Sequence, residues 1–169
     1  AEVVGQMSHT GHIGVLATEG TIKSESYKLE IAKLYPQCTV IGQACPTWVP
    51  LVECGEFDKI GADYFVKDSL DKLLAQDPLI DTIILGCTHF PLLLPKIHRY
   101  TPEGITLIPQ GQYIAASLED YLHRHPEMNQ RLTQGGTTQY LTSESTTKFR
   151  ESASLFLKEN ITAQRVTLN

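Results

Sequence analysis

The chain lacks three features that would place it in a familiar functional class. Its 169 residues contain no apolar run long enough to cross a bilayer, so we expect no membrane as a partner. No run of Lys or Arg occurs and the formal net charge is −5, which argues against nucleic acid as a partner. The four cysteines have no Cys-x-x-Cys spacing, so we expect reduced thiols and neither a disulfide framework nor a zinc site.

An initiator Met is also lacking, and no signal peptide opens the sequence. From its start, Ala-Glu-Val-Val-Gly, we expect the chain to be an internal piece of a longer protein. Its length and 41% apolar content are enough for one good core, or for one domain plus part of another.

Short apolar runs alternate with amphipathic ones along the chain. Strands are predicted at 13–17, 39–44, 80–86, 105–108, 139–141 and 165–168. Helices are predicted at 24–35, 48–53, 57–74, 92–99 and 112–123, with a last one that places Phe149, Ala153 and Phe156 on one face. Within 57–74 we expect Ile60, Tyr64 and Leu74 to face inward. This alternation predicts an α/β fold with a mostly parallel sheet covered on both faces.

Cys87 is the most informative residue, because it lies where a buried strand gives way to a helix start marked by Pro91. The first turn of a helix presents unpaired N–H groups and positive potential that favour a thiolate. Thr88 is expected to cap that helix, and His89 is a side chain that can pass or hold a proton near neutral pH. These residues alone leave a catalytic thiol and an ordinary capped helix equally open.

Two more loops are expected at the carboxyl edge of the sheet, where open parallel sheets bind ligands. In the first, Thr18 and Thr21 flank Gly20 before a helix, an arrangement that can hold a carboxylate or serve as an ordinary N-cap. In the second, Cys45 competes with Cys87 for a chemical role, although a buried structural thiol is the commoner fate. Glu53 follows two apolar residues and either faces inward or is exposed.

Three ordered motifs carry a resemblance to one family. They are 14–21 with Ser24 and Tyr27, then 44–53, then 80–93, which contains Gly-Cys-Thr-His-Phe-Pro. The chain resembles the glutamate racemases, a family of the aspartate/glutamate racemase superfamily. The likeness covers essentially the whole chain and is weaker after Ile108, where Pro109-Gln110 replaces the family's usual acidic residue and serine.

The resemblance implies a cofactor-independent racemase that binds no metal and interconverts L- and D-glutamate with two cysteines, one on each side of the substrate Cα. Cys87 would be the base usually assigned to L-glutamate, His89 would assist it, and Glu53 would position His89. The residues expected to contact substrate are Thr88, Thr18 and Thr21. The family's other cysteine lies upstream, and none of the remaining cysteines of this chain occupies a similar motif.

The family fold consists of two similar α/β domains, the first completed by the C-terminal segment. On that plan 1–108 is the complete second domain and 109–169 completes the first. The face formed by Phe149, Ala153 and Phe156 would then lack its cover, and the isolated chain would be inactive and prone to associate. We also expect a homo-oligomer in the cytoplasm that supplies D-glutamate for bacterial peptidoglycan.

Three alternatives stay open. A related racemase would act on aspartate or hydantoins, but aspartate relatives usually carry an acid at the position of His89. A non-catalytic module of the same fold would bind a small acid or a protein partner. A metal enzyme using His123 and His125 is the weakest alternative, because a solvated pair is the more common role for two histidines beside an acidic helix.

Overall fold

The computed structural model describes residues 4–168, which fall into two compact units divided between Glu119 and Asp120. The division lies within one helix, whereas the sequence predicts a domain boundary after Ile108. The assignment of 109–169 to a first racemase domain stays a prediction.

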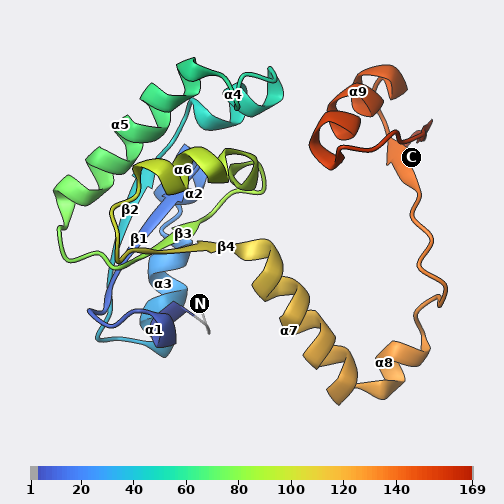
Figure 1. Ribbon diagram of the computed structural model, residues 1–169. Helices are drawn as coiled ribbons and strands as arrows, with labels where there is room; N and C mark the ends of the chain where they lie inside the picture. Colours follow the sequence, from blue (N-terminus) through green and yellow to red (C-terminus); the bar gives the residue numbers. More distant parts are fainter. Residues whose placement is uncertain (1–3, 169) are drawn as a thin grey trace. The chain divides into compact units, whose positions relative to one another are not determined.

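The first unit is built on a four-stranded parallel sheet with the strand order β2-β1-β3-β4 (Figure 1). The strands are β1 (His12–Ala17), β2 (Thr39–Ala44), β3 (Thr82–Leu85) and β4 (Thr106–Pro109). The two central strands are almost wholly buried, as expected for a parallel sheet covered on both faces. The predicted parallel α/β architecture is therefore confirmed.

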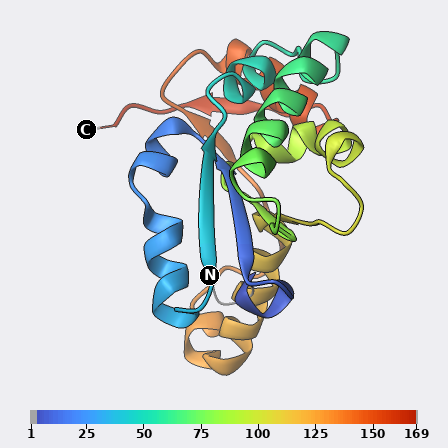
Figure 2. The same ribbon diagram turned by 90° about the vertical axis from the view of Figure 1, so that its left-hand side faces the viewer.

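Helices cover both faces of this sheet. In sequence order the helical elements that begin in the first unit are α1 (Val4–Met7), α2 (Glu19–Lys23), α3 (Ser26–Leu34), α4 (Trp48–Glu53), α5 (Ile60–Gln76), the 3-10 turn η1 (Phe90–Leu93), α6 (Leu94–Tyr100) and α7 (Gln110–Arg124), the last of which continues into the second unit. Figure 2 views the sheet from the β2 edge, with α3 on one side and α5 on the other. The α5 and α6 helices pack against each other, and α4 contacts η1.

The inward face of α5 differs from the predicted one. Ile60 is 88% exposed and Tyr64 is 70% exposed, and Leu74 is half-buried. The buried stripe consists of Ala62, Val66, Ser69, Leu70 and Leu73. These residues recur at helical spacing from Ala62 onward, so the helix is rotated relative to the prediction and its first apolar residue faces solvent.

The second unit contains α8 (Pro126–Gln130), β5 (Tyr140–Thr142), α9 (Thr146–Leu157) and β6 (Ala163–Arg165). Its two strands pair in parallel, and the last strand lies earlier than the predicted 165–168. Phe149, Ala153 and Phe156 are half-buried, so the predicted lack of cover on this face is only partly correct. The ring of Phe149 lies 6.5 Å from that of Tyr140.

Within residues 4–168, none of the helices combines the length and the apolarity that a membrane span requires.

Candidate active site

The register of the sheet brings the predicted loops to one edge. Ala17 pairs with Ala44, and Leu16 pairs with Leu85. Thr18 therefore directly follows β1 and Cys45 directly follows the neighbouring β2. Gly86-Cys87 follows β3, the neighbour of β1 on its other side. The carboxyl ends of three adjacent parallel strands thus present their loops side by side, which is where ligands bind in open α/β sheets.

Cys87, His89 and Glu53 form a chain of contacts at this edge. The Cys87 Sγ lies 3.9 Å from His89 Nδ1, and His89 Nε2 lies 2.6 Å from Glu53 Oε1. Cys87 is half-buried, and the side chains of His89 and Glu53 are 29% and 48% exposed. Because a carboxylate only accepts hydrogen bonds, Glu53 favours the tautomer in which Nε2 carries the proton and Nδ1 offers its lone pair to the thiol. The arrangement can move a proton between sulfur and imidazole.

The turn after Cys87 explains how these side chains are held. The Phe90 N–H donates to the Cys87 carbonyl at 3.2 Å and the Leu92 N–H donates to the His89 carbonyl at 3.1 Å, which closes the 3-10 turn. The buried Phe90 ring packs 4.6 Å from the ring of Trp48 on α4, the helix that also carries Glu53. This aromatic contact joins the two elements that supply the acid and the imidazole.

The predicted cap by Thr88 is wrong. Thr88 is exposed, and the N-cap position of η1 is His89, which makes no side-chain cap hydrogen bond. The chain after Cys87 opens as a 3-10 turn with Pro91 in its first residues, and the regular α6 begins only at Leu94. A cap by Thr88 would accept from the N–H groups of residues 90 and 91, but the Phe90 N–H donates to the Cys87 carbonyl and Pro91 has no N–H.

Cys45 has the structural role that the sequence favours. Its side chain is 1% exposed, and burial raises the pKa of its thiol to about 12, only partly offset by a hydrogen bond with Ser69. A thiol of this kind stays protonated and poorly nucleophilic near neutral pH. Of the two cysteines at the sheet edge, Cys87 is therefore the one suited to proton transfer.

Thr18 and Thr21 come together at the start of α2. Their Oγ1 atoms are 3.0 Å apart, and the Thr18 hydroxyl accepts a long hydrogen bond from the Thr21 N–H. The ordinary N-cap interpretation is therefore realised. A contact of either hydroxyl with substrate stays a prediction.

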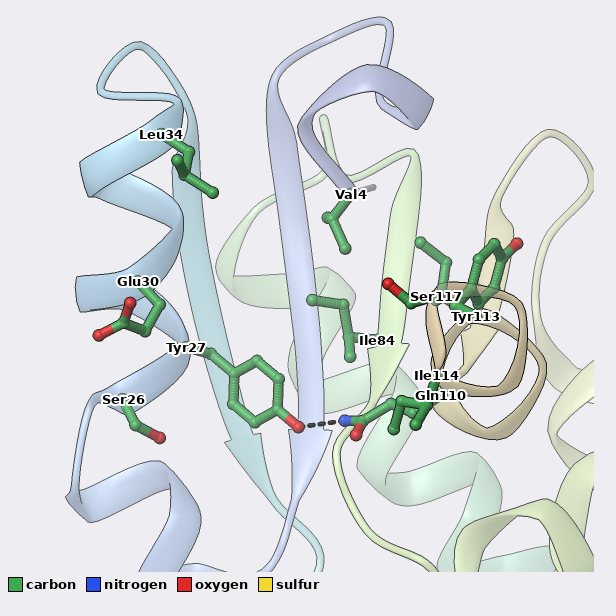
Figure 3. Close-up of a pocket in the computed structure, with 11 residues that line it drawn as sticks. Val4, Ser26, Tyr27, Glu30, Leu34, Ile84, Gln110, Tyr113, Ile114 and Ser117 are labelled. Carbon is green, nitrogen blue, oxygen red and sulfur yellow. Dashed lines mark hydrogen bonds between the residues drawn. The ribbon is translucent and has the colours of Figure 1, made fainter. Parts of the chain in front are cut away.

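Sequence reasoning missed a contact between Tyr27 and Gln110. Gln110 is the first residue of α7, and its Nε2 donates to the Tyr27 hydroxyl across a cavity of about 470 Å³ in the first unit (Figure 3). The signal was present in part, because Tyr27 belongs to the first motif and Pro109-Gln110 is the point where the chain departs from the expected pattern.

No group of three or more His, Cys, Asp or Glu within residues 4–168 is arranged to hold a metal ion. His125 instead lies 3.3 Å from Glu127, and its ring packs 4.3 Å from that of Tyr121. His123 is exposed on the same helix as Tyr121.

Comparison with known proteins identifies the family. The family model described as Asp/Glu/Hydantoin racemase matches residues 2–118. The chain belongs to the Asp/Glu/Hydantoin racemase family. The family match covers all of the strands of the four-stranded sheet and both elements that carry Cys87, His89 and Glu53.

Individual racemases resemble the chain along most of its length. A glutamate racemase of Lactiplantibacillus plantarum is 38% identical over 162 residues, which cover 95% of this chain and 59% of that protein. The crystal structure of a glutamate racemase isoform of Bacillus anthracis has a TM-score of 0.87 and 31% identity, covering 99% of this chain and 61% of that chain. A Francisella tularensis glutamate racemase in complex with D-glutamate has a TM-score of 0.78 and 25% identity, with 98% and 60% covered. The chain thus spans about three fifths of the length of the curated relatives it matches.

Proposed function

We propose that the chain is the Cys87-bearing part of a glutamate racemase, an isomerase that interconverts L- and D-glutamate without a cofactor. The observation that carries the proposal is the Cys87–His89–Glu53 chain at the carboxyl edge of a racemase-family sheet. Glutamate is favoured as substrate because the similar proteins are named glutamate racemases and the Francisella tularensis enzyme binds D-glutamate.

The proposed reaction exchanges one hydrogen at the substrate Cα. The Cys87 thiolate takes the Cα proton, the electron pair of the broken C–H bond stays on carbon, and a thiol on the opposite face gives its proton to that carbon. His89 accepts the thiol proton when Cys87 must be a base, and Glu53 stabilises the imidazolium. The Cα–H group is far less acidic than a thiol, and each unit of pKa mismatch is worth about 1.36 kcal/mol, so the site must also stabilise the carbanion.

The opposite thiol is proposed to come from outside residues 1–169. Two groups on opposite faces are needed because a single base tends to return the proton to the face it left. Cys45, the other thiol at this edge, is buried and opens no second face to a substrate. In the same proposal 1–108 forms the second racemase domain, 109–169 completes the first, and Thr18, Thr21 and Thr88 contact the glutamate.

The biological setting follows from the same proposal. A glutamate racemase supplies D-glutamate for bacterial peptidoglycan, which places the protein in the cytoplasm. We also propose a homo-oligomer, because exposed apolar side chains of α7 such as Ile114 and Leu118 can contact another copy of the protein.

Deuterium exchange tests the proposal. The protein in its full natural length is incubated with L-glutamate in D₂O, and NMR follows deuterium at Cα while chiral chromatography follows D-glutamate. We expect both to form, Cys87→Ser to lower kcat by about three orders of magnitude or more, and Cys54→Ser, which changes an exposed thiol, to have no effect. Racemisation that survives in Cys87→Ser would contradict the assignment.

A comparison of substrates and an assay of residues 1–169 alone distinguish the alternatives. A higher kcat/KM for aspartate or a hydantoin than for glutamate would favour a related racemase, and glutamate binding without exchange would favour a non-catalytic module. Residues 1–169 alone are expected to give no inversion. Robust racemisation by this stretch alone would refute the need for a second thiol from elsewhere.

A further inference from the structure

Tyr27 and Gln110 meet beneath the loop that carries Cys87. Tyr27 is half-buried on α3, and Gln110 opens α7, which follows β4. The tyrosine points across the face of β1 toward Gln110, whose amide donates to its hydroxyl (Figure 3). The bond joins residues 83 positions apart and connects a helix to the end of an edge strand.

The tyrosine ring also lies directly against Gly86. A Cβ built on Gly86 would lie 3.2 Å from Tyr27 Cε2 and 3.3 Å from its hydroxyl oxygen, and 3.0 Å from the Ala17 Cβ. These distances are shorter than ordinary van der Waals contact, so a Cβ at this position would require the ring or Ala17 to shift by a few tenths of an ångström. On its other side Gly86 is held by β1, because its N–H donates to the Leu16 carbonyl at 2.8 Å.

Gly86 is the residue immediately before Cys87. Its backbone is enclosed by β1 and by the tyrosine ring, and the tyrosine is in turn held by Gln110. Small displacements of a reacting group are costly in catalysis, on the order of a hundredfold in rate for about 1 Å. A group that fixes the backbone next to a proton-transferring thiol is therefore placed to control the rate.

We propose that Tyr27 and Gln110 act together as positioning residues for Cys87, holding its backbone so that the sulfur faces His89 and the substrate Cα. This inference rests on the function proposed above. It gives Gln110 a role at the position where the chain departs from the family's usual acidic residue and serine. Neither residue touches the reacting atoms, so the effect passes through Gly86.

Four substitutions in the full-length protein test the proposal. Tyr27→Phe removes only the hydroxyl, and Gln110→Ala removes the donor. Gln110→Glu restores the link, because its carboxylate accepts a hydrogen bond from the tyrosine hydroxyl. Gly86→Ala adds a methyl group against Ala17 and the Tyr27 ring. Matched controls are Tyr113→Phe in the same cavity wall and Gln112→Ala, an exposed glutamine of α7.

Two readouts are needed, kcat and KM for glutamate and the rate at which iodoacetamide alkylates Cys87, followed by peptide mass spectrometry. We expect Tyr27→Phe and Gln110→Ala each to lower kcat about tenfold, the rate equivalent of one ordinary hydrogen bond, with KM little changed. Cys87 alkylation should slow in parallel while that of Cys54 does not change. The double variant should lose no more than either single variant, Gln110→Glu should recover most of kcat, and Gly86→Ala should lower it.

The outcomes distinguish this inference from the proposed function. If the unmodified protein racemises glutamate but Tyr27→Phe and Gln110→Ala leave kcat and Cys87 alkylation unchanged, the positioning role is wrong. It is also wrong if the two variants lower only the melting temperature, or if Gln110→Glu behaves like Gln110→Ala. If the unmodified protein does not racemise glutamate, the proposed function fails, whereas slower alkylation of Cys87 in the variants would still show the link to the thiol.

Discussion

Glu53 and His89 are joined by a contact of 2.6 Å between Oε1 and Nε2, although 36 residues separate them in sequence. The sequence left Glu53 either inward-facing or exposed, and the structure shows that it is exposed and still bound to the imidazole. An exposed carboxylate can therefore orient a ring that lies beside a half-buried thiol.

Replacing this carboxylate with an amide is the first prediction. Glu53→Gln keeps the shape of the side chain but removes the charge that stabilises a protonated His89. We expect kcat for glutamate to fall about tenfold, equivalent to about 1.4 kcal/mol, with a smaller change in KM. Steady-state kinetics of the full-length protein measure both. The control is Glu56→Gln, which removes a comparably exposed carboxylate bound to Lys59, and an equal loss in the two variants would argue against a specific role for Glu53.

Cys45 and Cys54 are predicted to differ widely in reactivity. Burial raises the pKa of the Cys45 thiol from 9.0 to about 12, which lowers its thiolate fraction about a thousandfold near pH 8. Iodoacetamide should therefore modify the exposed Cys54 long before Cys45, as peptide mass spectrometry can show. In concentrated guanidinium chloride the two rates should converge. Early alkylation of Cys45 in the folded protein would show that its burial is incomplete.

The raised pKa of Cys45 also predicts a pH dependence. Its value in the fold exceeds the ordinary one, so the stability that comes from keeping the thiol protonated is fully present below pH 9.0 and is lost as the pH rises toward about 12. Cys45→Ala should be less sensitive to alkali than the unmodified protein, which unfolding by guanidinium chloride at several alkaline pH values can measure.

Asp81 is predicted to stabilise the fold against acid. Partial burial by itself raises the pKa of this carboxyl, but hydrogen bonds from the Ser8 hydroxyl and from the N–H groups of Thr10 and His9 outweigh it and hold the pKa at about 2. Because the folded pKa lies below the ordinary 3.8, the stabilisation is present above pH 3.8 and is lost as the pH falls toward about 2.

Asp81→Asn tests this arrangement. After allowance for solvent screening, we expect it to lower the free energy of unfolding near neutral pH by about 1 kcal/mol and to flatten its dependence on pH below 3.8. Guanidinium unfolding followed by circular dichroism at several pH values measures both. Asp71→Asn, which changes an exposed carboxylate bound to Lys67, should leave the acid dependence as it is. If both variants respond alike, the carboxyl of Asp81 has no special role.

The sheet and its loops were predictable because their physical signals are local. A parallel strand that is covered on both faces is typically a continuous apolar run. The segment 13–17 is such a run, and 80–86 contains the shorter run Ile83-Ile84-Leu85. The carboxyl ends of parallel strands share an edge, so the position of Cys87 beside Thr18 and Cys45 followed from the strands alone. The predicted inward face of α5 was wrong because the sequence does not show whether Ile60, an apolar residue at a helix start, is buried or exposed.

The long-range contacts were beyond reach for a different reason. Gln110 bonds with Tyr27 across 83 residues, and Asp81 binds Ser8 across 73. Such pairs depend on how two elements pack, and the sequence around each residue contains no pattern that identifies its partner. The predicted Thr88 cap failed because the Phe90 N–H bonds to the Cys87 carbonyl in a 3-10 turn, and the sequence does not show this turn in advance.

Trp48 is the single tryptophan of the chain, is fully buried, and donates from its indole nitrogen to the Phe65 carbonyl at 3.2 Å. It therefore acts as a built-in optical reporter, since its emission belongs to one known place and needs no label. A displacement of the 3-10 turn moves Phe90 against the indole, so we expect the emission of Trp48 to report the position of this turn, in real time and without turnover.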